Sequence, residues 1–176
     1  MSTPFYEQTG EDRYGADAMA GDLAERKVSE VCEARSRPVV RFGPFRVSTE
    51  RAQQMTWPKE VRFMPDFLEF GRAIECQGSN GEYIIFKEEK LQALIWWNTI
   101  IPVWFGIYNQ KTDEVIFADI ASVLWAIEHP DTEFMVLDAE TRYPKDAYKV
   151  PMEVLLERKF ADAFAAAKVL HEKGRK

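Results

Sequence analysis

The stretch that decides the fold is VRFMPDFLEFGRAIECQGSNG, residues 61–81. Apolar and polar residues alternate on both sides of a turn expected at Glu69–Arg72. This alternation predicts an antiparallel hairpin with strands Val61–Phe70 and Gly71–Gln77. The rest of the fold can be predicted outward from this hairpin.

Helices and further strands flank the hairpin. Apolar residues at helical spacing predict a first helix over Ala18–Ala34 and a second over Lys87–Thr99, while the polar stretch Arg51–Lys59 indicates a loop or a short helix. The other predicted elements are strands Pro38–Phe42, Phe45–Ser48, Pro102–Tyr108 and Glu114–Ala118, helix Ala121–Glu128, edge strand Glu133–Leu137, and an amphipathic helix after Pro151. This order predicts an α/β fold, in which a mixed β-sheet is flanked by helices.

The length and composition predict one domain with extensions. The chain has 176 residues, of which 46% are hydrophobic, enough for a single packed core. We expect a flexible N-terminal segment over 1–17 and an α/β core over 18–137. A loop and the C-terminal amphipathic helix, over 138–176, would pack on the core or on a partner subunit.

The charge of the chain bears on whether it binds nucleic acid. The net charge of −6 argues against a protein that coats nucleic acid by bulk attraction. Residues 35–72 nevertheless carry eight basic and four acidic side chains. This block could face phosphates, or it could be a solvated surface of mixed sign.

The two cysteines, Cys32 and Cys76, are expected to be small buried hydrophobic residues. With no signal peptide at Met1–Asp12, a reducing cytoplasm is the simplest location. No apolar run approaches the roughly 20 residues that cross a bilayer, so no membrane association is expected.

Asp66, Glu75 and Gln77 form the candidate site. Glu75 and Gln77 are two residues apart on one strand and point to the same face, and the hairpin places Asp66 across from Glu75. Two carboxylates that converge in a pocket repel each other unless a cation lies between them. Hard oxygen ligands favour Mg²⁺, with Mn²⁺ as a substitute. Alternatively, Asp66 caps a backbone N–H at the strand end and Glu75 faces solvent.

The spacing resembles a known nuclease signature. Pro65-Asp66, eight intervening residues and then Glu75-Cys76-Gln77 are similar to the motif of the PD-(D/E)XK nuclease superfamily, which has a restriction-endonuclease-like fold. The similarity covers roughly residues 18–120, and within the superfamily the chain resembles small phage or archaeal Holliday-junction resolvases. The resemblance implies an αβββαβ core, followed here by a C-terminal helical extension.

The resemblance also implies roles for single residues. Asp66 and Glu75 would bind Mg²⁺, and Glu25 on the first helix would complete the metal site, with Glu30 as the alternative. Gln77 stands where the superfamily usually has the lysine that orients the attacking water. Candidates for the missing cation, or for a facing polar group, lie on the second helix: Lys87, Lys90 and Gln92.

A nuclease of this kind would contact DNA through the basic block. The candidate DNA-binding residues are Arg41, Arg46, Arg51, Trp57, Lys59 and Arg62. Two sites on a symmetric homodimer would suit the cutting of two strands, with the second or the C-terminal helix at the interface.

The leading hypothesis is therefore a Mg²⁺-dependent nuclease that hydrolyses DNA phosphodiester bonds in phage or bacterial DNA recombination or processing. It would act in the cytoplasm, which is the host cytoplasm if a phage encodes it, and branched DNA is one candidate substrate. A second hypothesis is a catalytically inactive protein of the same fold that binds DNA or a host protein. A third is an α/β scaffold in which the motif is accidental.

Overall fold

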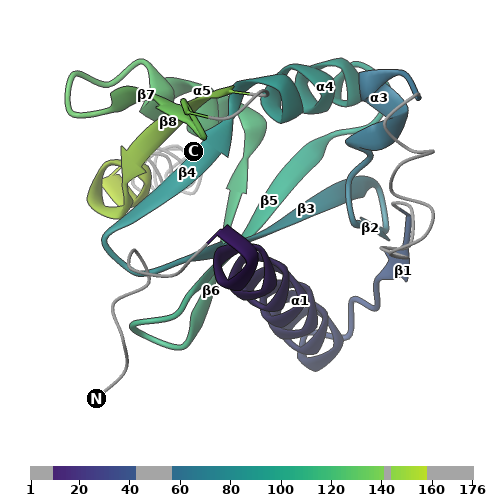
Figure 1. The fold of residues 1–176 in the computed structure, drawn as a ribbon. Coiled ribbons are helices and arrows are strands. Elements are labelled where there is room, and N and C mark those ends of the chain that lie inside the picture. The colour runs from purple at the N-terminus through teal and green to yellow at the C-terminus, as the bar shows by residue number, and fades with distance from the viewer. Residues whose placement is uncertain (1–9, 43–56, 141–143, 158–176) are drawn as a thin grey trace, which may run out of the picture.

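Two β-sheets and the helices around them make up the described chain (Figure 1). The computed structural model describes residues 10–42, 57–140 and 144–157. One sheet has the strand order β1-β2-β3-β5-β6, and its strands are β1 (Val40–Arg41), β2 (Phe67–Glu69), β3 (Arg72–Ser79), β5 (Val103–Asn109) and β6 (Glu114–Asp119). The other has the order β4-β8-β7, with strands β4 (Tyr83–Lys87), β8 (Lys145–Pro151) and β7 (Glu133–Leu137).

The helices lie on both faces of the five-stranded sheet. They are α1 (Gly10–Ala34), α3 (Lys59–Arg62), α4 (Glu88–Asn98) and α5 (Ile120–Ile127), and a further helical stretch covers 152–157. Strands β1, β2 and β3 are antiparallel, whereas β3 and β5 are parallel and are connected through β4 and α4. The predicted α/β class, with a mixed sheet flanked by helices in αβββαβ order, is confirmed.

The hairpin forms with the predicted turn. Strands β2 and β3 pair in the register Phe67↔Ile74 and Glu69↔Arg72, and Gly71 in the turn has a φ of +82°, which glycine tolerates. The first strand is shorter than predicted, because Lys59–Arg62 form α3 and β2 begins only at Phe67. Pro65 lacks an N–H donor, so the ladder cannot extend through it.

Other boundaries also differ from the sequence-based predictions. Helix α1 begins at Gly10, eight residues before the predicted start, and β8 occupies part of the segment that we expected to be a loop. Strand β4 was not predicted. The strand predicted over Phe45–Ser48, and the C-terminal helix after residue 157, lie outside the described residues.

The two faces of the larger sheet bury different side chains. On one face, Val28 and Cys32 of α1 pack against Phe67, Ile74 and Cys76. On the other face, α4, α5 and the second sheet pack against alternate residues of β3, β5 and β6. Both cysteines are buried and free, as predicted.

Gly106 of β5 sets the distance between α1 and the sheet. A Cβ atom at this position would lie 2.7 Å and 2.9 Å from the two γ carbons of Val28. The absence of a side chain therefore lets α1 approach the sheet closely, which places Glu25, one turn before Val28, at the end of the hairpin.

Candidate active site

Asp66 lies at the point where β2 and β3 separate. Extending their register by one residue places Asp66 opposite Glu75, as predicted. The Asp66 Oδ2 atom accepts a hydrogen bond from the backbone N–H of Cys76 at 2.7 Å. The alternative prediction, that Asp66 caps a backbone N–H, therefore also holds. The Asp66 residue is only 8% exposed.

Glu75 is completely buried, so it does not face solvent. Its side chain points to the face of the sheet that α4 covers, and it forms an ion pair with Lys90 of α4. The Lys90 side chain is 29% exposed, so this ammonium lies between the buried carboxylate and water. A buried carboxylate is costly without a partner, and Lys90 provides one.

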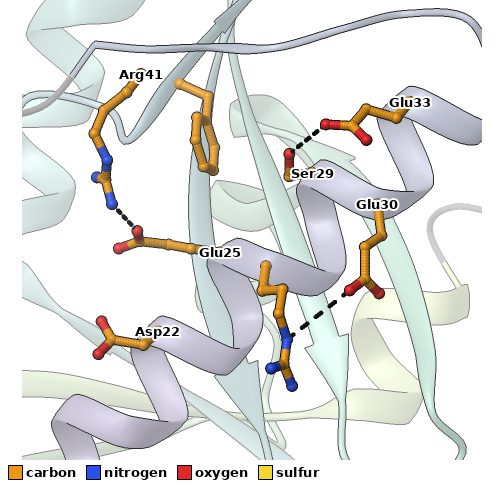
Figure 2. Close-up of a pocket in the computed structure, with 8 residues that line it drawn as sticks. Asp22, Glu25, Ser29, Glu30, Glu33 and Arg41 are labelled. Atoms are coloured by element: carbon orange, nitrogen blue, oxygen red, sulfur yellow. Dashed lines mark hydrogen bonds and ion pairs between the residues drawn. The ribbon is translucent and has the colours of Figure 1, made fainter.

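The structure distinguishes the two glutamates that were candidates on α1. Glu25 is 5% exposed and forms an ion pair with Arg41 of β1 (Figure 2). Glu30 is exposed and lies 3.9 Å from Arg26 on the same helix. Glu25, and not Glu30, is therefore the glutamate of α1 that is buried and paired with β1.

The candidate charged groups affect the pKa of the buried Cys76 thiol. Burial raises the pKa of the Cys76 thiol well above its ordinary value, and the carboxylates of Asp66, Glu75 and Glu25 raise it further. The Lys90 ammonium acts in the opposite direction. These four charged groups therefore all influence the protonation of one buried residue of β3.

Gln77 is held by the second sheet. Its Nε2 atom donates a hydrogen bond to the backbone carbonyl of Ile85 in β4. Gln77, Lys87 and Lys90 line one small cavity, so the structure brings these three candidates together. The Ile85 contact was missed because β4 was not predicted, although the run Tyr83–Phe86 after a Gly-containing loop is a strand signal.

The residues predicted to contact DNA lie on different elements. Lys59 and Arg62 belong to α3, whereas Arg41 belongs to β1. Lys59 and Arg62 of α3 reach α4, where Lys59 donates to Gln92 at 2.9 Å and Arg62 pairs with Glu89. Trp57 is 41% exposed, as expected for a contact residue. Arg46 and Arg51 lie outside the described residues.

An open groove of about 460 Å³ lies along α1. It is lined by Asp22, Glu25, Arg26, Ser29, Glu30, Glu33, Arg41 and Phe67 (Figure 2). Of the three candidate carboxylates, Asp66, Glu75 and Glu25, only Glu25 lines it. Arg41 also lines this groove, and its guanidinium lies 5.5 Å from the centre of the Phe67 ring.

The donor set suits a magnesium ion by its chemistry. Glu25, Asp66 and Glu75 offer carboxylate oxygens, and Mg²⁺ commonly takes one or two protein carboxylates together with waters and substrate phosphates. Within the described residues, however, no three His, Cys, Asp or Glu side chains are arranged to hold a metal ion together. Glu25, Asp66 and Glu75 therefore do not form a three-carboxylate metal site in the described part of the structure.

Comparisons with known proteins give similarity to solved structures but not to any family profile or curated sequence. A scan against protein-family profiles finds no match. No curated protein has a matching sequence. Among solved structures, a nuclease from a fusselovirus aligns over 93% of this chain and 99% of its own, with 12% sequence identity and a TM-score of 0.40. A TM-score below 0.5 does not establish a common fold, so this similarity carries no information about function.

In the part of the chain that the structure describes, no helix is both long and apolar enough to cross a membrane.

Proposed function

We propose that this protein is a divalent-metal-dependent nuclease of the PD-(D/E)XK type that hydrolyses phosphodiester bonds in DNA. The observation that supports the proposal is the cluster of buried charges at the end of the hairpin. Asp66 follows the register opposite Glu75 and accepts from the Cys76 N–H, Lys90 pairs with Glu75, and Glu25 is buried on α1. Burying three carboxylates opposes folding, so a cluster of this kind indicates a role in chemistry.

Asp66 and Glu75 would hold Mg²⁺, with Glu25 nearby. When bound, the ion lowers the pKa of a coordinated water and stabilises charge that develops on a phosphate. The hydrogen bond from Cys76 N–H fixes the position of the Asp66 carboxylate through its Oδ2 atom. This orientation is established before any ligand arrives, because the backbone of β3 provides it.

Lys90 would supply the cation that the motif usually carries at the position of Gln77. The Gln77 amide is engaged by the Ile85 carbonyl, which favours a role in joining β3 to β4. The Lys90 ammonium already contacts Glu75 and is partly exposed, so it can contact a phosphate oxygen or the attacking water. Lys87 lines the same cavity and would assist it.

The finer features of the proposal concern the substrate and the assembly. The acting form would be a homodimer in the cytoplasm, and the substrate would be DNA in recombination or processing, with branched DNA included. Lys59, Arg62 and Trp57 would contact the DNA backbone or bases. The other proposed contacts are Arg41, Arg46 and Arg51.

The test is cleavage of labelled duplex, single-stranded and branched DNA with Mg²⁺ or Mn²⁺. Asp66→Asn and Glu75→Gln should each lower the cleavage rate by at least about a hundredfold. Glu30→Gln is the matched control, because it removes an exposed carboxylate from α1 and should leave the rate unchanged. Wild-type rates in Asp66→Asn and Glu75→Gln, with circular dichroism showing folded protein, would reject the proposal.

A second candidate function is binding without catalysis. It is favoured by Gln77 in place of lysine and by the internal ion pairs that Glu25 and Glu75 form with Arg41 and Lys90. Such a protein would bind DNA or a basic host protein. The second partner would contact segment 73–139, which carries three basic and eleven acidic side chains. Calorimetry with Mn²⁺ separates the two functions, because the binding protein should give no heat that depends on Asp66 and Glu75.

A further inference from the structure

The turn of the β2–β3 hairpin exposes an aromatic side chain. Phe70 is 96% exposed, more than any other large hydrophobic residue in the described part of the chain. The turn between Glu69 and Arg72 needs Gly71, which has a φ of +82°, but it does not need a phenylalanine. The ring is therefore available to another molecule.

Ion pairs hold the turn in place. The Glu69 side chain is 1% exposed and pairs with Arg72, its partner in the ladder, and with Arg37 at 2.9 Å. The Arg72 guanidinium lies 4.7 Å from the centre of the Trp104 ring and 5.3 Å from that of Phe117. The residues beside the exposed ring are therefore fixed before any ligand arrives, which lowers the entropic cost of binding.

The surface beside the turn is basic, although the whole chain carries a net charge of −6. Arg37 and Arg72 share the single carboxylate of Glu69, and Arg35 lies over the Phe117 ring that Arg72 also contacts. Arg35 and Arg37 are exposed. An exposed aromatic ring beside exposed arginines suits single-stranded nucleic acid, because the ring stacks on a base while the guanidinium groups bind phosphates.

We propose that the β2–β3 turn is a contact for unpaired DNA, in which Phe70 stacks on a base and Arg35 and Arg37 bind the adjacent phosphates. This inference rests on the proposed function in taking DNA as the ligand, but it requires no metal ion. It narrows the substrate to DNA with unpaired bases, such as a fork or a branch point. A base inside a duplex is already stacked and would first have to be unpaired.

The turn lies close to the carboxylates that the proposed function uses. Four residues of extended chain separate Phe70 from Asp66, which is roughly 13 Å at about 3.3 Å per residue. The arginines lie with Phe117 on the face of the sheet that α1 covers, whereas Glu75 points to the α4 face. The two faces meet at the turn. A fork whose strands separate at Phe70 would therefore place one strand on each face.

The experiment measures the binding of labelled DNA by fluorescence anisotropy in EDTA, so that neither a metal ion nor cleavage affects the result. The two probes are a forked DNA with unpaired arms and a fully paired duplex of the same length. Phe70→Ala should weaken binding of the fork by about tenfold, as expected for the loss of one stacked base, and should leave binding of the duplex unchanged. Phe70→Trp, which keeps an aromatic ring, should bind the fork like the wild type.

Phe134→Ala is the matched control. Phe134 is an exposed phenylalanine of β7 in the second sheet, so its loss should change neither affinity. A direct readout is crosslinking, in which 5-iodouracil in an unpaired arm should react with Phe70, as located by mass spectrometry of the peptides.

The arginines give an independent readout. Arg35→Gln and Arg37→Gln should each reduce the slope of log Kd against log salt for the fork by about 0.7, the value for one phosphate contact with a single strand. Arg37 also pairs with the buried Glu69, so Arg35→Gln provides the result if Arg37→Gln does not fold.

The results that would overturn the inference differ from those that would overturn the proposed function. If Phe70→Ala binds the fork as tightly as the wild type, or weakens fork and duplex alike, the contact is wrong and the nuclease proposal stands. If the wild type binds neither DNA in EDTA, the contact is also wrong, which leaves a protein as the partner of Phe70. If fork binding depends on Phe70 but cleavage does not depend on Asp66 and Glu75, the contact stands and the nuclease proposal fails.

Discussion

The ion pair between Lys90 and Glu75 allows a quantitative test of how the candidate site is built into the core. Glu75 is fully buried on β3, and Lys90 reaches it from α4 with a partly exposed side chain. We consider three variants measured without divalent metal: Lys90→Met, Glu75→Leu and the two combined. Each replaces a charged side chain by an apolar one of similar length.

The burial of the two partners sets the expected sizes. Lys90→Met leaves a carboxylate without its ammonium in a site closed to water, and removing one partner of a buried pair costs about 3–5 kcal/mol. Glu75→Leu leaves an ammonium that can turn to solvent, so we expect a loss of roughly 1 kcal/mol. The double variant has no buried charge and should lie within about 1 kcal/mol of the wild type, because an apolar pair can replace an ion pair at little cost.

The assay is urea unfolding followed by circular dichroism, with thermal unfolding as a second measure. For a chain of this length, each kcal/mol shifts the unfolding midpoint by about 2–4 °C, so Lys90→Met should lower it by roughly 6–20 °C. Lys59→Met is the matched control, because Lys59 also contacts α4 but binds the exposed amide of Gln92. We expect Lys59→Met to change the stability by less than about 0.5 kcal/mol.

The double-mutant cycle decides the outcome. A coupling energy of at least about 2 kcal/mol between Lys90 and Glu75 is expected. Additive effects, or a double variant as unstable as Lys90→Met, would refute the reasoning from burial. A stable double variant that cleaves no DNA would show that the pair is kept for function and not for stability.

Three further predictions follow from other contacts. Gly106→Ala should destabilise the fold by about 1–3 kcal/mol because its methyl group overlaps Val28, and adding Val28→Ala should recover part of the loss in thermal unfolding. Burial raises the pKa of the Cys76 thiol, and the Asp66 and Glu75 carboxylates raise it further. Iodoacetamide at about pH 8.5 should therefore alkylate Cys76 far more slowly in the folded protein than in guanidinium. Peptide mapping measures the two rates, and equal rates would contradict the prediction. Asp66→Ala leaves the buried Cys76 N–H without its acceptor and should cost about 1–3 kcal/mol in urea unfolding, whereas Asp66→Asn keeps an acceptor and should cost less.

The local sequence determined the hairpin and the helices around it. Strict alternation about the Gly71 turn fixed the register of β2 and β3, and therefore the position of Asp66 relative to Glu75. The apolar spacing of α4 fixed its bounds to within one residue at each end. These features depend on neighbours a few residues apart, which a periodic pattern records directly.

The tertiary structure decided which charged groups meet. Glu25 and Glu30 are equivalent by spacing alone, and only the packing of α1 on Gly106 buries one and exposes the other. Likewise, both Lys87 and Lys90 were candidates, and the orientation of α4 placed Lys90 on Glu75.

The sequence patterns also did not predict the second sheet. Strand β4 pairs with β8, about sixty residues later in the chain, and the Gln77 contact with Ile85 depends on the position of β4. The hydrophobic pattern records which face of an element is buried, but it does not record the distant residue that covers that face. The sequence by itself therefore determined the elements and the candidate carboxylates. The partners of those carboxylates, Arg41 and Lys90, were decided only when α1, β1 and α4 packed around β3.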